Sequence, residues 1–143
     1  MKVAIIDYGS GNIKSLYNSL NFLNYTPILT NDTKEINDCD KIILPGVGSF
    51  DNCISKIHTK VDIENLKNEI LFKKKFFLGI CVGMQILSSF GFENRKTNGL
   101  NIIEGVVEKI NTKLLPLPHV GWNNIEITKN DKIFNGMESL LDF

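Results

Sequence analysis

The chain has 143 residues, of which 43% are hydrophobic and 22% are charged, and its 16 basic residues balance 16 acidic ones. This length suits one domain with a hydrophobic core, and zero net charge gives no overall field that would attract nucleic acid or an anionic membrane. With no apolar run of about 20 residues and no secretory signal before the first apolar run, we expect a cytoplasmic protein without nucleic-acid or membrane partners.

Short apolar runs alternate with amphipathic stretches over the first two-thirds of the chain. Strand runs that are continuously apolar and separated by helices indicate a parallel sheet covered on both faces. Beyond Gly91 the partly alternating segments indicate an antiparallel extension of that sheet. The predicted fold is therefore a three-layer, mainly parallel α/β domain spanning residues 1–143. Strands are predicted at 3–6, 26–30, 41–44 and 76–80, helices over 13–23, 63–70 and 82–90, and extended segments over 100–110 and 124–127.

Two further segments carry structural expectations. Lys73-Lys74-Lys75 directly precedes the strand at 76–80, and we interpret this short basic run as a solvated strand entry. The last five residues, 139–143, turn apolar again. We expect this tail either to dock as a final helix or to precede further elements of a longer domain.

The three cysteines, Cys39, Cys53 and Cys81, contain no C-x-x-C pair and are odd in number. In a reducing cytosol this argues against a disulfide framework and against a zinc site, so we expect no metal and no cofactor. Cys39 and Cys53 lie in no motif, and we expect them to be small buried apolar residues.

Cys81 lies in a different setting, the sequence Gly79-Ile80-Cys81-Val82-Gly83. A predicted strand runs through this motif directly into a predicted helix, which is the form of a nucleophile elbow. Flanking glycines are needed because such a turn brings the strand and helix backbones close together. A helix amino terminus favours the thiolate, the form that attacks, and the N–H of Val82 is expected to point to a developing oxyanion.

The second signal is Pro45-Gly46-Val47-Gly48, which follows the third strand. Its two glycines permit a backbone that side chains would forbid, with N–H groups free to face a ligand. Taken alone, the segment could be any tight turn or an anion-binding loop, although it lacks the Lys-Ser/Thr of a P-loop. The Gly9-Ser10-Gly11 turn after the first strand is likewise weak evidence for nucleotide binding, because the third glycine of the dinucleotide fingerprint is missing.

The third cluster is the stretch 116–123, which presents His119 between a proline and a glycine, and Trp122 and Asn123 directly after that glycine. His119 is a candidate base for Cys81. A recognition surface is an equally valid interpretation, because tryptophan favours the centres of interfaces. The other histidine, His58, is expected to be an exposed residue near a helix end.

Four co-linear motifs, at residues 5–12, 44–50, 79–87 and 118–123, together resemble the glutaminase subunit of imidazole glycerol phosphate synthase. The G-x-C-x-G-x-Q core alone resembles the class I glutamine amidotransferases in general. The Asp-Tyr-Gly start and the Pro-His-x-Gly-Trp-Asn loop narrow the resemblance to this subfamily of histidine biosynthesis, and it spans the whole chain.

The resemblance implies that Cys81 attacks the side-chain amide of glutamine and forms a glutamyl thioester and ammonia. Gly48 or Val47, together with Val82, would stabilise the oxyanion through backbone N–H groups, and Gln85 would help to hold the substrate. His119, Trp122 and Asn123 would face a (β/α)8-barrel cyclase partner in a heterodimer, through which ammonia passes without meeting solvent.

Two features depart from the family pattern. Residues 88–94 replace a common Glu-rich stretch with a Gly-aromatic-Glu pattern, which resembles relatives that supply ammonia for surface-sugar amidination. The His-Pro-x-Glu segment that supplies the family's base and its orienting carboxylate is not found in these 143 residues. The family continues for roughly 50–60 further residues, within usual domain sizes. We therefore expect an incomplete domain whose residues 1–143 are inactive alone.

Two rival interpretations remain open at this stage. A cysteine-elbow enzyme of the intracellular peptidase and deglycase group would share the Cys81 motif, but would not be expected to combine it with the loops at 45–48 and 118–123. A truncated or decayed amidotransferase domain, which at most binds its partner, would account for the missing base.

Overall fold

The computed structural model describes residues 1–112, 116–129, 131–137 and 140–142. The chain divides into two compact units, Met1–Lys109 and Ile110–Phe143, and each is described by itself. The expectation of one domain over 1–143 stays a prediction. Within the described ranges, no helix combines the length and the apolar character that crossing a bilayer requires.

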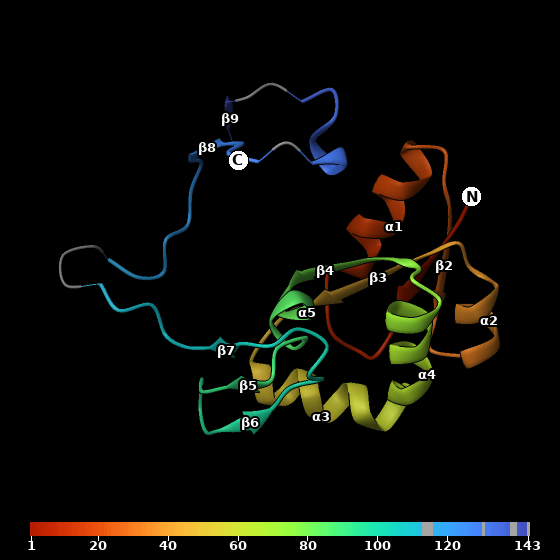
Figure 1. Cartoon of the computed structure of the whole chain (residues 1–143), viewed down its shortest axis with the longest axis horizontal. Helices are drawn as coiled ribbons and strands as arrows, with labels where there is room; N and C mark the ends of the chain where they lie inside the picture. Colours follow the sequence, from red (N-terminus) through yellow and green to blue (C-terminus); the bar gives the residue numbers. More distant parts are fainter. Residues whose placement is uncertain (113–115, 130, 138–139, 143) are drawn as a thin grey trace. The chain divides into compact units, whose positions relative to one another are not determined.

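The first unit is built on a four-stranded parallel sheet of order β2-β1-β3-β4 (Figure 1). This confirms the predicted α/β class and the four predicted strands. The helices are α1 (Ile13–Phe22), α2 (Thr33–Asp38), α3 (Phe50–Lys60), α4 (Ile63–Lys67) and α5 (Val82–Gln85), and the strands are β1 (Lys2–Ile6), β2 (Thr26–Thr30), β3 (Lys41–Gly46) and β4 (Phe76–Cys81).

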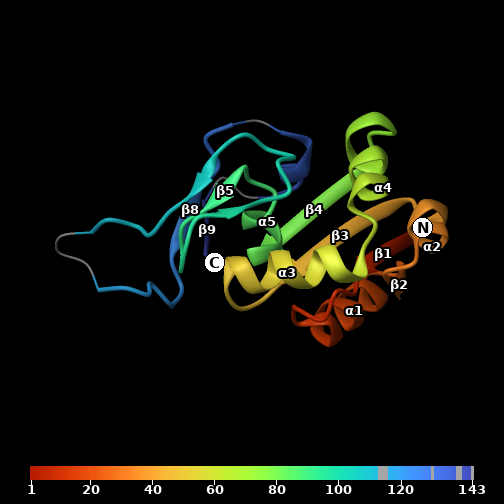
Figure 2. The same ribbon diagram turned by 90° about the horizontal axis from the view of Figure 1, so that it is seen from below.

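Both faces of the central strands are covered, because successive side chains of a strand point to opposite faces. In β1, Ala4 and Ile6 belong to the larger core cluster, to which α2, α3, α4 and α5 contribute, whereas Val3 and Ile5 pack with Leu20 of α1. Figure 1 shows α1 on one side of the sheet and α3 and α4 on the other, and Figure 2 shows β3 and β4 side by side. The predicted double coverage is thus confirmed for these strands.

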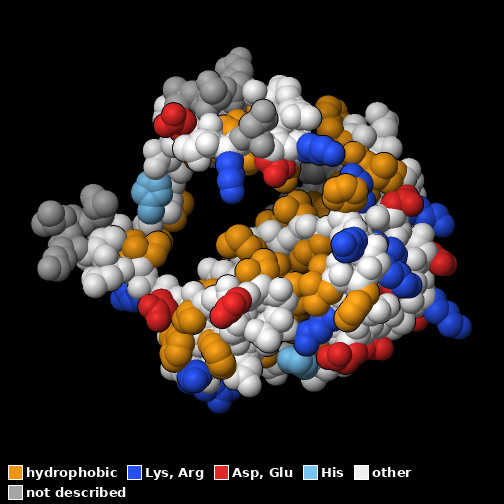
Figure 3. Space-filling model, viewed as in Figure 1, with side chains coloured by type: hydrophobic (Ala, Val, Ile, Leu, Met, Phe, Trp, Pro, Cys, Tyr) orange, Lys and Arg blue, Asp and Glu red, His pale blue; other side chains and the backbone are white. Residues whose placement is uncertain are grey.

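The outer strand β4 differs from its neighbours. Its side chains Phe76, Leu78 and Ile80 are 75%, 47% and 38% exposed, and Figure 3 shows apolar side chains gathered on the face of the molecule over β4 and α5. Because these three residues alternate along the strand, they share one face of the sheet. That face of β4 is left open by the helices of this unit.

The helix predicted over 82–90 is wrong in length, because α5 ends at Gln85 and residues 90–91 form strand β5 (Phe90–Gly91). The carbonyl oxygens of Ile86 and Leu87 accept hydrogen bonds from the N–H groups of residues 100, 102 and 103. A longer helix would need those carbonyls for its own i→i+4 ladder. A segment that is distant in sequence therefore ends the helix.

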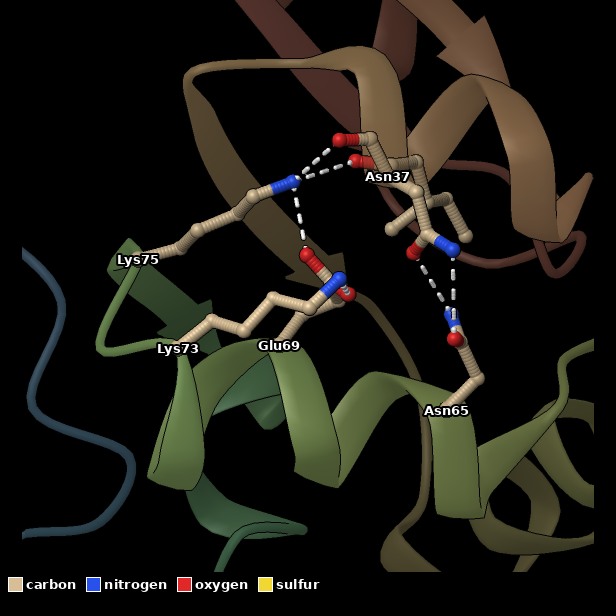
Figure 4. A network of polar contacts seen from close by, with 6 residues as sticks. Asn37, Asn65, Glu69, Lys73 and Lys75 are labelled. Atoms are coloured by element: carbon tan, nitrogen blue, oxygen red, sulfur yellow. Dashed lines mark hydrogen bonds and ion pairs between the residues drawn. The ribbon is translucent and has the colours of Figure 1, made fainter.

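The Lys73-Lys74-Lys75 run is a solvated strand entry only in part: Lys73 and Lys74 are exposed, as predicted, but Lys75 is not. The helical segment 63–72 passes from α4 into a π-helical turn, Asn68–Phe72, which buries the carboxylate of Glu69 completely. Lys73 Nζ lies 2.5 Å and Lys75 Nζ 2.7 Å from the two carboxylate oxygens (Figure 4). The Lys75 side chain is only 15% exposed and also donates to the carbonyl oxygens of Ile36 and Asn37.

The antiparallel elements form small separate sheets and do not extend the central one. In the first unit, β5 pairs antiparallel with β6 (Thr97–Asn98) and parallel with β7 (Val106–Val107). In the second unit, β8 (Asn124–Glu126) pairs antiparallel with β9 (Leu140–Asp142), and a 3-10 turn spans Lys132–Phe134. The backbone at 140–142 is thus a strand, and not the final helix that was one of the two expectations for the tail. Residues 139 and 143 of the tail lie outside the described residues.

Candidate active site

Cys81 is the last residue of β4 and α5 begins at the next residue, so the predicted strand–turn–helix elbow is present. Its backbone has φ 54° and ψ −120°, a combination that costs a non-glycine residue about 1–3 kcal/mol and persists only where the surroundings impose it. Cys81 is exposed, whereas Cys39 and Cys53 are buried as predicted. Burial raises the pKa of the Cys39 thiol.

The glycines around Cys81 are required by contacts with β3 and α5. A Cβ added at Gly83 would lie 2.0 Å from the carbonyl oxygen of Leu44, and one at Gly79 would lie 2.7 Å from the Cα of Met84. A Cβ at Gly46 would lie 2.3 Å from the N of Gly83. These distances are far below van der Waals contact, so strand, loop and helix can meet at the elbow only where side chains are absent.

The loop after β3 lies next to the cysteine. In the parallel register of β3 and β4, Gly46 is the direct partner of Cys81, so residues 46–48 leave the sheet beside the elbow. Gly48 has φ 101°, and a Cβ there would meet no atom within 4 Å. This backbone therefore adopts a conformation that favours glycine and faces open space, as expected of a ligand-contacting loop.

The side chain of Ser10 is hydrogen-bonded to this loop, a contact that was not predicted. Its Oγ donates to the carbonyl oxygen of Val47 at 2.6 Å and accepts from the N–H of Val47 at 3.1 Å. The buried thiol of Cys53 lies 3.3 Å from the same Oγ and 3.5 Å from the Val47 oxygen. The signal in the sequence is the hydroxyl between the two glycines of the first turn, a position that turn formation alone also explains.

Two other side chains support the loop. Tyr8 is fully buried, its hydroxyl would be 2.9 Å from a Cβ at Gly46, and burial together with the Cys53 thiol raises its pKa well above the ordinary value. At the far end of the loop, Glu93 Oε2 accepts from the N–H of Phe50 at 2.7 Å, where α3 begins. No motif in the sequence indicates the contact made by Glu93.

The remaining candidate residues lie on α5 and in the second unit. Val82 is buried and opens α5, where Gln85 is half-buried. Trp122 is 86% exposed, and His119 and Asn123 are exposed on the same loop. His58 is exposed in the last turn of α3, as predicted. Among the described residues, no group of three or more His, Cys, Asp or Glu side chains has an arrangement that could hold a metal ion.

Comparisons with known proteins extend over nearly the whole chain. The family model for glutamine amidotransferase class-I matches residues 4–140. The chain is 38% identical over 142 residues to the imidazole glycerol phosphate synthase subunit HisH 1 of Campylobacter jejuni subsp. jejuni, which covers 99% of this chain and 71% of that protein. It is 40% identical over 145 residues to the subunit HisH of Pelagibacter ubique, with 97% and 70% covered, and 41% identical over 137 residues to that of Caldanaerobacter subterraneus, with 96% and 66% covered.

Proposed function

Because the chain belongs to the class-I glutamine amidotransferase family, we propose that it is the glutaminase subunit of an imidazole glycerol phosphate synthase in histidine biosynthesis. The observation that carries the proposal is the strained, exposed Cys81 at the end of β4, with Gly46 as its register partner. A nucleophile and a glycine loop thus lie at the carboxyl edge of the sheet, where open α/β sheets bind their ligands.

The proposed chemistry begins with the Cys81 thiolate, which adds to the carboxamide carbon of glutamine and moves the carbonyl electrons onto oxygen. Backbone N–H groups stabilise that oxyanion: Val82 N–H from α5, and Gly48 or Val47 N–H from the loop. The tetrahedral species then expels the protonated amine as ammonia and leaves a glutamyl thioester, which water hydrolyses to glutamate. Gln85 is proposed to help hold the substrate.

A general base must take the thiol proton and later protonate the leaving amine. We do not assign it to His119, because neither histidine of these 143 residues is followed by the Pro-x-Glu that would orient it. The match covers 71% and 70% of the first two relatives. By resemblance to the family, the base and its orienting carboxylate are expected in a His-Pro-x-Glu segment.

The proposed partner is a (β/α)8-barrel cyclase that receives the ammonia in a heterodimer. Support comes from the exposure of His119, Trp122 and Asn123 on one loop, since an exposed tryptophan is typical of an interface centre. The word "subunit" in the relatives' names indicates that they act with another chain. The synthase as a whole would then combine a hydrolase and a lyase activity, in the cytoplasm, where three free cysteines remain reduced.

A second candidate is an amidotransferase subunit that supplies ammonia for surface-sugar amidination. The Gly-aromatic-Glu pattern at 91–93 favours it. It would use the same Cys81 chemistry and differ in the acceptor of the ammonia.

The test is glutamate release from glutamine by the full-length protein, with and without the cyclase subunit encoded in the same genome. We expect the cyclase to stimulate hydrolysis and to form imidazole glycerol phosphate. Cys81→Ser should abolish the reaction, and the matched variant Cys39→Ser should retain it. Hydrolysis that persists in Cys81→Ser would refute the proposed nucleophile. Stimulation by a sugar-amidating partner and not by the cyclase would establish the second candidate.

A further inference from the structure

The sequence contains two Asn-Gly pairs, Asn98-Gly99 and Asn135-Gly136. An asparagine that precedes a glycine can lose its side-chain amide without an enzyme, because glycine has no Cβ to keep its backbone nitrogen away from the preceding side chain. In a folded protein the rate depends on whether that nitrogen is exposed and on how easily the backbone around it opens. The two pairs differ in both respects.

The pair Asn98-Gly99 is held by several backbone contacts. Asn98 belongs to β6 and pairs with β5. The Gly99 N–H donates to the carbonyl oxygen of Ser89 at 2.9 Å, and a Cβ added at Gly99 would lie 2.0 Å from the carbonyl oxygen of Ser88. The following residue, Leu100, is 1% exposed. The Gly99 nitrogen is thus both hydrogen-bonded and tightly packed, so Asn98 could react only after this segment opened.

The pair Asn135-Gly136 is exposed and directly follows the 3-10 turn Lys132–Phe134. Asn135 has φ −60° and ψ 125°, and Gly136 has φ 82°. The Met137 N–H donates to the carbonyl oxygen of Phe134 at 3.0 Å. This is a type II turn, in which the peptide between the two central residues takes no part in the closing hydrogen bond. No described residue accepts a hydrogen bond from the Gly136 N–H, and a Cβ at Gly136 would meet nothing within 4 Å.

We propose that Asn135 is a site of spontaneous deamidation, at which the backbone nitrogen of Gly136 is the nucleophile. This nitrogen gives its proton to a base in the solvent and adds to the side-chain carbon Cγ of Asn135. The new C–N bond closes a cyclic imide, while the Cγ–Nδ2 bond breaks and the amide nitrogen takes up a proton and leaves as ammonia. Water then opens the imide at either carbonyl and yields aspartate or isoaspartate. No step involves Cys81, so the inference is independent of the proposed glutaminase function.

The conformational change that the reaction requires is smaller at Asn135 than at Asn98. The ψ angle of Asn135 must rotate before the Gly136 nitrogen reaches Cγ, and this rotation breaks the one hydrogen bond that closes an exposed turn. At Asn98 the same rotation breaks the Gly99 bond and pulls Leu100 out of the core. Because such an opening is rarer, we expect Asn135 to react at least about tenfold faster, which corresponds to about 1.4 kcal/mol.

The test follows both sites in the full-length protein, kept folded in mildly alkaline buffer and, in parallel, unfolded in urea. Samples taken over time are digested with pepsin in acid, where the imide forms slowly. Mass spectrometry then measures the conversion of amide into acid in the peptides that contain residues 98 and 135. We expect the rate difference in the folded protein only, because in urea both pairs are free to turn.

Isoaspartate identifies the mechanism, since it forms only when water opens a cyclic imide. It is measured as methyl transfer from S-adenosylmethionine by protein-isoaspartate methyltransferase. The signal should disappear in Asn135→Gln, because glutamine would have to close a larger and less favourable ring, and it should remain in the matched control Asn98→Gln.

Three results would overturn the inference. The first is a ratio of the two rates, residue 135 over residue 98, that is no higher in the folded protein than in urea. The second is an Asn135 that stays intact in the folded protein while it converts in urea. The third is a product that contains aspartate but no isoaspartate, which would mean direct hydrolysis without attack by the Gly136 nitrogen. None of these results bears on glutamine hydrolysis, which Cys81→Ser tests separately.

Discussion

Replacing Glu69 by glutamine preserves the shape of the side chain but removes the charge that two lysines share. The Glu69 side chain is 0% exposed, the Lys75 side chain 15% and the Lys73 side chain 53%. When the side-chain amide of Asn37 is oriented so that its oxygen and its nitrogen both find partners, the nitrogen donates to Glu69 Oε1 at 3.0 Å. The variant therefore leaves one half-buried ammonium facing an uncharged group at the junction of α2, the π-helical turn and β4 (Figure 4).

The size of the effect follows from this burial. Removing one partner of a buried ion pair costs about 3–5 kcal/mol, and Lys75 retains its bonds to the carbonyls of Ile36 and Asn37. Lys73 can turn to water. We therefore expect the lower end, about 3 kcal/mol of unfolding free energy, which in a chain of this size lowers the melting temperature by about 10 °C.

The assay is urea denaturation of the wild type, Glu69→Gln and Glu64→Gln. Glu64 is the matched control, because it pairs with Lys67 on the same helical segment but is 87% exposed, and such pairs contribute about 0–1 kcal/mol. If Glu69→Gln costs no more than Glu64→Gln, burial of the pair is not what stabilises this junction.

The pH dependence provides an independent check. Burial raises the pKa of Glu69, but the bonds and charges of Lys73 and Lys75 outweigh it and leave the pKa below its ordinary value. A carboxyl group with a depressed pKa in the folded state stabilises the protein fully above its unfolded pKa of about 4.3, and this stabilisation is lost as the pH falls. The difference between wild type and Glu69→Gln should thus be full at pH 7 and shrink below about pH 4.

Five further outcomes are expected. Gly83→Ala should unfold the elbow and lower the unfolding free energy by more than about 3 kcal/mol, since its Cβ would overlap a β3 carbonyl oxygen; a stable variant in urea titration would refute this contact. Cys81→Gly should be more stable than Cys81→Ser by about 1 kcal/mol, because glycine relieves the strained φ, and equal midpoints would show no strain. Trp122→Ala should weaken cyclase binding at least tenfold in calorimetry. His119→Ala should keep detectable glutaminase activity in the complex. If His119→Ala instead loses all thioester formation while it still binds the cyclase, His119 is the base. A polypeptide of residues 1–143 should release no glutamate from glutamine even with the cyclase, and turnover near one per second would reveal another base.

The parts of the fold that local patterns determine could be predicted. The four sheet strands are short apolar runs whose burial needs no other information, and the glycines beside Cys81 have one structural purpose, a close approach of backbones. The end of α5 could not be predicted, because it depends on residues 100, 102 and 103 binding the carbonyl oxygens of Ile86 and Leu87, which a longer helix would need. The local spacing of apolar residues does not show that these distant N–H groups compete for the same carbonyl oxygens.

The same limit applies to the candidate site. The contact between Ser10 and Val47 joins residues 37 positions apart, and nothing in the Gly-x-Gly turn specifies it before the sheet register is known. Lys75 was misjudged for a related reason. Its partner Glu69 is polar, and only the π-helical turn brings that carboxylate into the interior.

The contact between Gly83 and Leu44 also bears on the time at which the protein becomes reactive. The backbone that sets the Cys81 thiol is held by β3, whose Leu44 lies 39 residues before Gly83, so the thiol cannot reach its strained geometry until β3 and β4 have paired. A nascent or partly unfolded chain would then carry an ordinary cysteine. During synthesis the cell would therefore not be exposed to a nucleophile that lacks a substrate pocket. Loss of the pairing between β3 and β4 would make Cys81 inactive before the rest of the chain unfolds.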